Sequence, residues 1–193
     1  MKASPNQICT AFAGPHKIAS GGIVEVAGAV RRWLDQDAAA TPLIFDDRSG
    51  MTIEVDLRGS VEEVRGRIEA PEGPSPERNG PGRPKLGVVS KEVGLLPRHW
   101  DWLATQPGGA SSTLRKLVEE ASKLRRPQDE ARLAQEAAYR FLSVMAGDLP
   151  LYEEALRAFY KRDGKKFDTI VELWPRDVRD HAKKLAAPHL EAK

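Results

Sequence analysis

The sequence predicts an α+β protein with a small N-terminal layer of sheet and helix, a central strand-helix-helix unit and an all-helical C-terminal part. Three observations support this prediction. Apolar and charged residues alternate between positions 51 and 59, which is typical of a half-buried strand. Apolar residues recur every three or four positions after residue 110, as they do in amphipathic helices. A stretch rich in Pro and Gly, residues 70–85, separates the two patterns.

The N-terminal segment carries the signals for four strands and two helices. Gly14-Pro15 marks a turn between the first two strands, and Ser20 precedes the first helix as a candidate cap. Ser60 and Glu63 have the spacing of a capping box at the start of the second helix. This order fits one small α+β layer. The predicted elements are strand 9–14, strand 16–20, helix 23–34, strand 42–47, strand 51–59 and helix 61–68.

Changes of composition divide the chain into four predicted segments. These are an α+β domain over residues 1–70, a flexible basic linker over 71–85, a strand-helix-helix unit over 86–126 and a helical bundle over 127–193. The linker has almost nothing to bury. We therefore expect limited proteolysis to cut first within residues 72–82.

The last two segments show helical spacing over most of their length. In the central unit, a strand-like run ending at Pro97 precedes a short helix, and Pro107-Gly108-Gly109 separates it from a second helix. Ser111 is a candidate cap for that second helix, which we expect to end near Leu124. In the C-terminal segment Asp148 is a candidate helix cap. The apolar stripe of the second central helix is Leu114, Leu117, Val118, Ala121 and Leu124.

The single cysteine, Cys9, excludes an intramolecular disulfide, so a reducing compartment fits the chain best. Cys9 is expected to be a small buried strand residue, because no His or basic residue adjoins it to activate a thiol. No apolar run is long enough to cross a bilayer, and the N-terminus lacks the apolar stretch of a secretory signal. The prediction is a cytoplasmic protein with no membrane contact.

Catalytic motifs find little support. Gly21-Gly22 lacks the Lys and Ser/Thr of a phosphate-binding loop, so a plain turn is favoured. Asp46-Asp47 suits the polar positions of a hairpin turn better than acid–base catalysis. The four histidines form no zinc-type cluster with cysteine. Asp177 and His181, four residues apart, favour an ion pair over a shared metal. We therefore expect no catalytic site, no metal and no cofactor.

The positive charge of the chain is concentrated in its middle quarter. Residues 1–77 carry 8 Lys or Arg and 12 Asp or Glu, a net of −4. Residues 78–126 carry 10 and 4, a net of +6, and residues 127–193 carry 12 of each. A local basic field attracts polyanions even when the whole protein is nearly neutral.

The run LLPRHWDWLATQPGGASSTLRKLVEEA resembles the ribbon-helix-helix family of DNA-binding proteins. In that family a strand ending in Leu-Pro leads to a helix, a glycine-containing turn with a Ser, and a second helix. The resemblance implies that two chains pair their strands into a ribbon that enters the major groove. It therefore implies a homodimer that binds double-stranded DNA.

The resemblance also places the base-reading side chains, matched by their distance from Pro97, at Lys91, Val93 and Leu95. Lys91 suits base readout. Val93 and Leu95 suit contacts with thymine methyl groups, and they suit a protein core equally well. Glu92 departs from the family, which has an apolar residue at that position.

Phosphate contacts are expected on both sides of the strand. Backbone N–H groups near Ser111 and Ser112 form an anion site at a helix N-terminus, and Arg115 adds salt-dependent affinity. Upstream, Gly-Arg-Pro-Lys matches the second half of an AT-hook, an extended element that places an Arg in a narrow minor groove. Arg83 and Lys85 are the basic residues of this arm.

Over its full length the chain resembles a family of uncharacterised bacterial proteins, the domain of unknown function numbered 2239. The runs GRPKLGVVSKEVGLLPRHWDWLATQPGGASSTLRKLVEEA and AAYRFLSVMAGDLP carry that resemblance. It implies a bacterial cytosolic protein and supplies no activity.

Three hypotheses follow. The first is a homodimeric, regulatory DNA-binding protein that contacts DNA through residues 82–124. The second is a non-catalytic protein-interaction module whose central strand joins the N-terminal sheet. The third, less favoured, is an enzyme or small-molecule binder that uses a cleft between the two parts. An exposed edge over residues 88–96 favours the first hypothesis, and burial of that strand in the N-terminal sheet favours the second.

Overall fold

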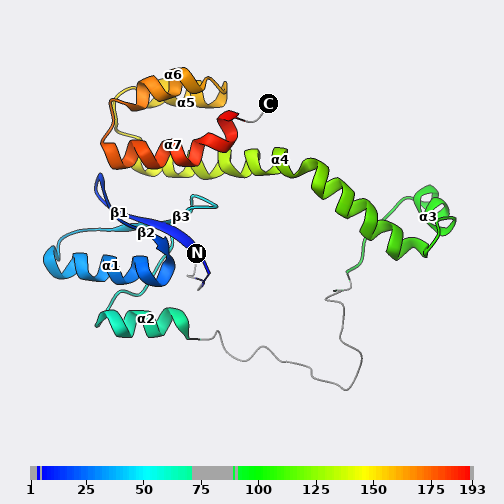
Figure 1. The fold of residues 1–193 in the computed structure, drawn as a ribbon, viewed down its shortest axis with the longest axis horizontal. Coiled ribbons are helices and arrows are strands. Elements are labelled where there is room, and N and C mark those ends of the chain that lie inside the picture. Colours follow the sequence, from blue (N-terminus) through cyan, green and yellow to red (C-terminus); the bar gives the residue numbers. More distant parts are fainter. Residues whose placement is uncertain (1–3, 5, 71–88, 90, 192–193) are drawn as a thin grey trace. The chain divides into compact units, whose positions relative to one another are not determined.

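The described residues form one antiparallel sheet and seven helices, which confirms the predicted α+β class (Figure 1). The computed structural model describes residues 4, 6–70, 89 and 91–191. The sheet has the order β2-β1-β3, with strands β1 (Ile8–Ala13), β2 (His16–Gly22) and β3 (Leu43–Asp46). The helices are α1 (Ile23–Gln36), α2 (Val61–Glu69), α3 (Pro97–Ala104), α4 (Gly109–Met145), α5 (Tyr152–Tyr160), α6 (Gly164–Val171) and α7 (Arg176–Glu191).

The chain forms two compact units. Unit 1 comprises Met1–Ala70 and Pro127–Lys193, and unit 2 comprises Pro71–Arg126. Helix α4 belongs to both, because its residues 109–126 lie in unit 2 and its residues 127–145 lie in unit 1. Segments 1–70 and 127–193, which the sequence analysis separates, therefore share one unit.

Both faces of the sheet in unit 1 are buried. Successive side chains of a strand point to opposite faces, so Cys9 and Ala11 join a core with α1 and α2, while Phe12 joins a second core with α4 to α7. On β3, Ile44 and Phe45 divide in the same way. Figure 1 shows α1 and α2 on one side of the sheet and α7 on the other. The central strand β1 is therefore apolar on both faces, as its sequence ICTAFA shows.

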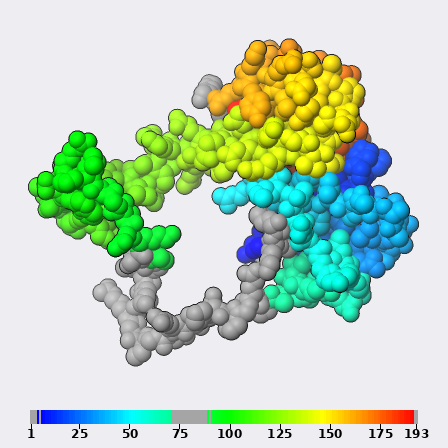
Figure 2. Space-filling view, turned by 180° about the vertical axis from the view of Figure 1, so that it is seen from behind, coloured from blue at the N-terminus to red at the C-terminus, as the bar shows by residue number. Residues whose placement is uncertain are grey.

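The space-filling view shows how closely the C-terminal helices cover the sheet (Figure 2). The yellow part of α4 lies directly on the cyan segment that contains β3. This contact is the second core, where the Phe45 ring lies 5.1 Å from that of Phe141 and the Phe12 ring lies 5.5 Å from it, measured between centroids. Residues from both ends of the chain thus stabilise one core.

Two predictions for the N-terminal segment are wrong in detail. Residues 51–59 form no regular strand: Thr52 makes an isolated β-bridge to Phe45, and Glu54 is likewise a single bridge residue. Ile53 is nevertheless buried and donates its N–H to the carbonyl of Ile44 at 2.7 Å, so the alternating pattern reports burial without a ladder. Ser20 does not cap α1, because it lies in β2 with its hydroxyl 2.9 Å from that of Thr10. The N-cap of α1 is Gly22, without a side-chain hydrogen bond.

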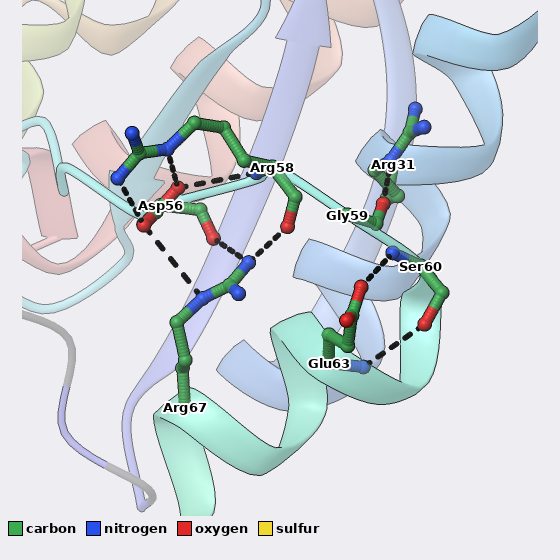
Figure 3. A network of polar contacts seen from close by, with 7 residues as sticks. All are labelled: Arg31, Asp56, Arg58, Gly59, Ser60, Glu63 and Arg67. Atoms are coloured by element: carbon green, nitrogen blue, oxygen red, sulfur yellow. Dashed lines mark hydrogen bonds and ion pairs between the residues drawn. The ribbon is translucent and has the colours of Figure 1, made fainter.

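A polar network fixes the chain between residue 56 and α2 (Figure 3). The predicted capping box is confirmed, because Ser60 accepts from the Glu63 N–H and Glu63 accepts from the Ser60 N–H. Asp56 accepts from both the backbone and the guanidinium of Arg58, and these bonds hold the pKa of Asp56 well below its usual range. Arg67 donates to the carbonyls of Asp56 and Arg58. Local hydrogen bonds of this kind compete with the bonds of a sheet ladder. They help to explain why residues 56–59 do not continue the pairing that Thr52 makes.

Two helix boundaries also differ from expectation. Helix α4 continues past Leu124 and through Pro127, although a proline removes one backbone hydrogen bond. Strong helix formers on both sides of Pro127 offset that loss. Helix α5 begins at Tyr152, with Leu151 in the left-handed region at its N-cap, so Asp148 is not the cap.

Candidate functional site

Unit 2 contains α3, the first half of α4 and the turn between them. Helix α3 begins with Pro97 at its first position, where the missing N–H costs nothing. Gly108 and Gly109 follow α3 with φ of 89° and 74°, values that favour glycine and that turn the chain into α4. Only Leu103 is a buried hydrophobic residue among the described positions of this unit, 89 and 91–126. The unit therefore has almost no core of its own.

Residues 91–96, which precede α3, do not form the predicted strand. They lie in neither a helix nor a strand, and they do not join the sheet, whose three strands all lie between residues 8 and 46. A strand needs a partner for its N–H and C=O groups, and the structure contains a single chain. Lys91 and Val93 are exposed, whereas Leu95 is half-buried and lines an apolar cleft. The segment is thus free of the N-terminal sheet, contrary to the second hypothesis.

The start of α4 places three predicted residues together. The helix begins at Gly109, so Ser111 and Ser112 lie inside its first turn and Ser111 is not its N-cap. No acidic side chain lies in this turn, and first-turn N–H groups have no partner within the helix. Arg115 donates from Nε to the carbonyl of Ser111 at 3.2 Å. Arg83 and Lys85, the predicted arm, lie outside the described residues.

Unit 2 has an excess of basic side chains, and few of them form ion pairs among the described residues. Residues 91–126 contain seven Lys or Arg and four Asp or Glu, a net of +3. Among these described side chains there is one ion pair, between Lys123 and Glu119 at 3.0 Å. The other six form no ion pair with a described residue. They are Lys91, Arg98, Arg115, Lys116, Arg125 and Arg126.

An apolar cleft of about 250 Å³ is lined by the segment that precedes α3, by α3 itself and by the first half of α4. Its lining residues are Leu95, His99, Trp102, Leu103, Leu114 and Leu117. Trp102 is 49% exposed, and Val118 beside the cleft is 66% exposed. Of the seventeen large hydrophobic side chains that the structure shows as exposed, eight belong to unit 2. Exposed apolar surface at this density is typical of an interaction site.

A second polar site lies in unit 1, at the turn after β3. Asp47 accepts from the Thr10 hydroxyl at 2.8 Å and from Lys184 Nζ at 2.6 Å. His181 Nε2 is 3.8 Å from Asp47 Oδ1 and has no hydrogen-bond partner, although the side chain is only 4% exposed. Burial lowers the pKa of His181 to about 4, while the Asp47 carboxylate opposes that shift. The imidazole is therefore neutral near neutral pH.

The surroundings of His181 explain its burial. Its ring lies edge-on to Phe12 and Phe141, with centroids 5.4 and 4.6 Å away. Asp177 does not pair with it, because Asp177 accepts from the backbone N–H of Lys17 at 2.8 Å. Sequence spacing could not find the Asp47–His181 contact, since the two residues are 134 positions apart.

Asp46 lies at a turn, as predicted. Its carboxylate accepts from the backbone N–H groups of Arg48 and Ser49 and from Gln7 Nε2. Burial alone would raise the pKa of Asp46, but these hydrogen bonds hold it below its usual value. Cys9 is fully buried, as predicted, and burial raises the pKa of its thiol to about 12. Neither group is suited to catalysis.

In the described part of the chain, no group of three or more His, Cys, Asp or Glu residues is placed to hold a metal ion. Over those same positions, no helix combines the length and apolar character that a membrane crossing requires.

Comparison with known proteins identifies a family and nothing closer. The model of a family described as an uncharacterized protein conserved in bacteria, DUF2239, matches residues 8–186. No curated protein and no solved structure matches the chain. The family match spans both units, so unit 2 lies within the region that defines the family.

Proposed function

We propose that this chain, which belongs to the uncharacterised bacterial family DUF2239, binds double-stranded DNA through unit 2 and does so as a homodimer. The observation that carries the proposal is the set of six basic side chains in unit 2 that have no acidic partner among the described residues. Cations held in ion pairs are already neutralised, whereas unpaired ones can replace the counterions of a phosphate backbone. The described part of unit 2 thus carries six basic side chains that no ion pair with a described residue neutralises.

The arrangement of these cations supports contact with a duplex. Arg115 and Lys116 lie in the second turn of α4, directly after the first-turn N–H groups, which have no partner within the helix. Both features favour an anion at the same place. Lys91 and Val93 are exposed and remain candidates for groove contacts, whereas Leu95 contributes to the apolar cleft. The proposal therefore relies on phosphate contacts more than on base readout.

Titration of fluorescent duplex DNA with the full chain at several salt concentrations tests the proposal. Each phosphate contact contributes about −0.9 to the slope of log affinity against log salt. The double variant Arg115→Ala/Lys116→Ala should weaken binding and reduce the size of the slope by up to about 2. The matched control is Arg65→Ala/Arg157→Ala, which removes the same charge from exposed ion pairs in unit 1.

A second pair of variants tests the helix N-terminus. Ser111→Glu places a carboxylate where the phosphate must lie, so it should abolish most of the affinity. Ser122→Glu adds the same charge to an exposed position in the middle of α4, and it should have a much smaller effect. Absence of binding at low salt, or equal losses in variants and controls, would show that the basic surface is only a solvated face.

The exposed hydrophobic side chains of unit 2 favour a second candidate, a non-catalytic protein-interaction module. In this case the partner covers the apolar cleft, and DNA is not a ligand. The two candidates differ in the salt titration, because apolar contacts do not weaken steeply as salt rises.

A further inference from the structure

We infer that a second copy of this chain docks on the exposed face of α4 between Leu114 and Leu124, with the two helices parallel. The apolar residues Leu114, Leu117, Ala121 and Leu124 have spacings of three, four and three. This is the spacing of the a and d positions of a coiled coil, starting with Leu114 at a. The inference does not rest on DNA binding, since it concerns only how two chains associate.

The described chain covers only the first part of the seam, where Leu114 is half-buried beside the cleft. Every residue of α4 from Arg115 to Glu130 is exposed, and the exposed fraction is 42% for Leu117 and 80% for Leu124. An isolated helical stretch of about 15 residues is only marginally stable in water, so helices in proteins normally rely on packing of an apolar face. A second helix supplies that packing.

Charge complementarity identifies the partner and its direction. With Leu114 at position a, Glu120 falls at g and Arg125 at the following e. In a parallel pair the g residue of one helix faces the next e residue of the other, so symmetry creates two Glu120–Arg125 pairs. Glu119, outside the seam, is already paired with Lys123, whereas neither Glu120 nor Arg125 forms an ion pair among the described residues.

An antiparallel pair fails the same test. If Leu114 faces Leu124 of the other helix, the two copies of Glu120 face each other. Like charges at such positions are destabilising. Arg125 then has no acidic residue opposite it. The sequence of this chain thus favours a parallel copy of itself.

Adjacent apolar residues extend the seam. Leu114 and Leu117 also line the cleft with Trp102, and Val118 at position e flanks the seam. A standard interface buries about 800 Å² on each partner, and a fully buried Trp alone contributes about 150–250 Å². Trp102 and Val118 therefore add substantially to the area that the seam itself can bury.

The parallel direction has a consequence for the proposed function. It brings the N-termini of both α4 helices to the same end of the pair. Arg115 and Lys116 of the two chains then lie at the same end of the dimer, where their charges act together. A parallel pair would thus double the basic surface, whereas an antiparallel pair would separate its halves.

Sedimentation of the full chain over a range from nanomolar to high micromolar tests the inference, with circular dichroism as the check on folding. The expected species is a dimer at the upper end. Leu124→Glu should abolish it, because it places two like charges in the seam. Leu173→Glu introduces the same change at an exposed leucine of unit 1 and should leave the dimer intact. Ala121→Ile should lower the dimer Kd several-fold, because a β-branched residue at position a fills the seam of a two-stranded coil.

Charge reversal decides the direction. Glu120→Arg and Arg125→Glu should each raise the Kd of a parallel dimer several-fold, and the double variant should restore it. In an antiparallel dimer Arg125→Glu would have little effect, and the double variant would restore nothing. A chain that remains monomeric throughout, a larger oligomer, a dimer that resists Leu124→Glu, or the antiparallel pattern would each overturn the inference. DNA binding by a monomeric chain would overturn the inference and the homodimer part of the proposed function, but it would leave the DNA-binding part standing.

Discussion

Units 1 and 2 use the same types of side chain in opposite ways. In unit 1 eleven Lys and Arg residues form ion pairs, whereas in unit 2 only Lys123 does so among the described positions. All but one of the buried hydrophobic residues of the described chain belong to unit 1, the exception being Leu103. Unit 1 is thus organised around its own core, and unit 2 presents its apolar and basic groups outward.

The difference indicates where the function lies. Unit 2 has almost no core, so a larger share of its apolar side chains is exposed and a larger share of its basic side chains is unpaired than in unit 1. Exposed apolar patches mark interaction sites, and clustered cations repel one another and attract polyanions. We therefore expect substitutions in unit 1 to change stability and substitutions in unit 2 to change association. The following predictions test that division, in order of expected effect.

Phe141→Ala should cause the largest loss of stability. Phe141 is fully buried on α4 and packs against Phe12 and Phe45 on one face of the sheet. Removing a buried Phe leaves a cavity and costs about 3–5 kcal/mol. Chemical denaturation followed by circular dichroism measures the change. Val118→Ala, which truncates an exposed residue of the same helix, is the control. Equal losses for both variants would contradict the division between the units.

Acid should destabilise unit 1 through His181. Burial lowers the folded-state pKa of His181 to about 4, below its ordinary value of 6.5. Between these values the unfolded chain binds the proton and the folded chain does not, so stability is complete above pH 6.5 and is lost as the pH falls. The expected loss is about 1.4 kcal/mol per pH unit, or about 3 kcal/mol in total.

Denaturation at a series of pH values measures this effect. The groups around the imidazole are Asp47, which raises its pKa, and Lys184 and Lys17, which lower it. His181→Leu removes the titrating group, so the slope of stability against pH should flatten over this window whatever the variant does to absolute stability. An unchanged slope would show that another group titrates.

Gly50→Ala should cost about 1–3 kcal/mol. Gly50 has φ of 67°, and a Cβ there would lie 2.1 Å from the carbonyl oxygen of Ala137 on α4. Neither backbone can move easily, because Arg140 donates to the neighbouring Ser49 carbonyl at 2.7 Å. Gly94→Ala in unit 2 is the matched control, since nothing lies within 4 Å of its Cβ. It should be neutral or slightly stabilising, and a comparable loss at both glycines would contradict the argument.

Local patterns predicted the elements that local forces decide. The capping box at Ser60 and Glu63, the turn at Gly14-Pro15 and the burial of Cys9 all depend on neighbours in sequence, and all are present. The strand at 51–59 failed because alternation reports which side chains are buried, not whether the backbone has a partner. Residues 91–96 likewise have a strand-like composition but form no strand, because their backbone has no strand to pair with among the described residues.

The sites depend on contacts that spacing cannot reveal. Asp47 meets His181 and Lys184 only because the C-terminal helices fold back on the N-terminal sheet, and no period in the sequence encodes that contact. The stripe from Leu114 to Leu124 was visible as a helical face, but only the structure shows that the described chain leaves it exposed from Leu117 onward. The predicted contact residues of the DNA interface remain predictions, and Arg83 and Lys85 lie outside the described residues.

The smallest effect should come from Leu124→Ala, compared with Leu142→Ala on the same helix. The chemical change is identical, but Leu142 is fully buried in unit 1 and Leu124 is 80% exposed in unit 2. Burial predicts a loss of about 2–5 kcal/mol at Leu142 and a change within about 0.5 kcal/mol at Leu124. Unfolding must be measured at a concentration where the chain is monomeric, because dimerisation stabilises the folded state by mass action. If Leu124→Ala destabilises the monomer as much as Leu142→Ala does, the leucine is part of a core within the chain. If its cost appears only as the protein concentration rises, α4 is an interface between chains.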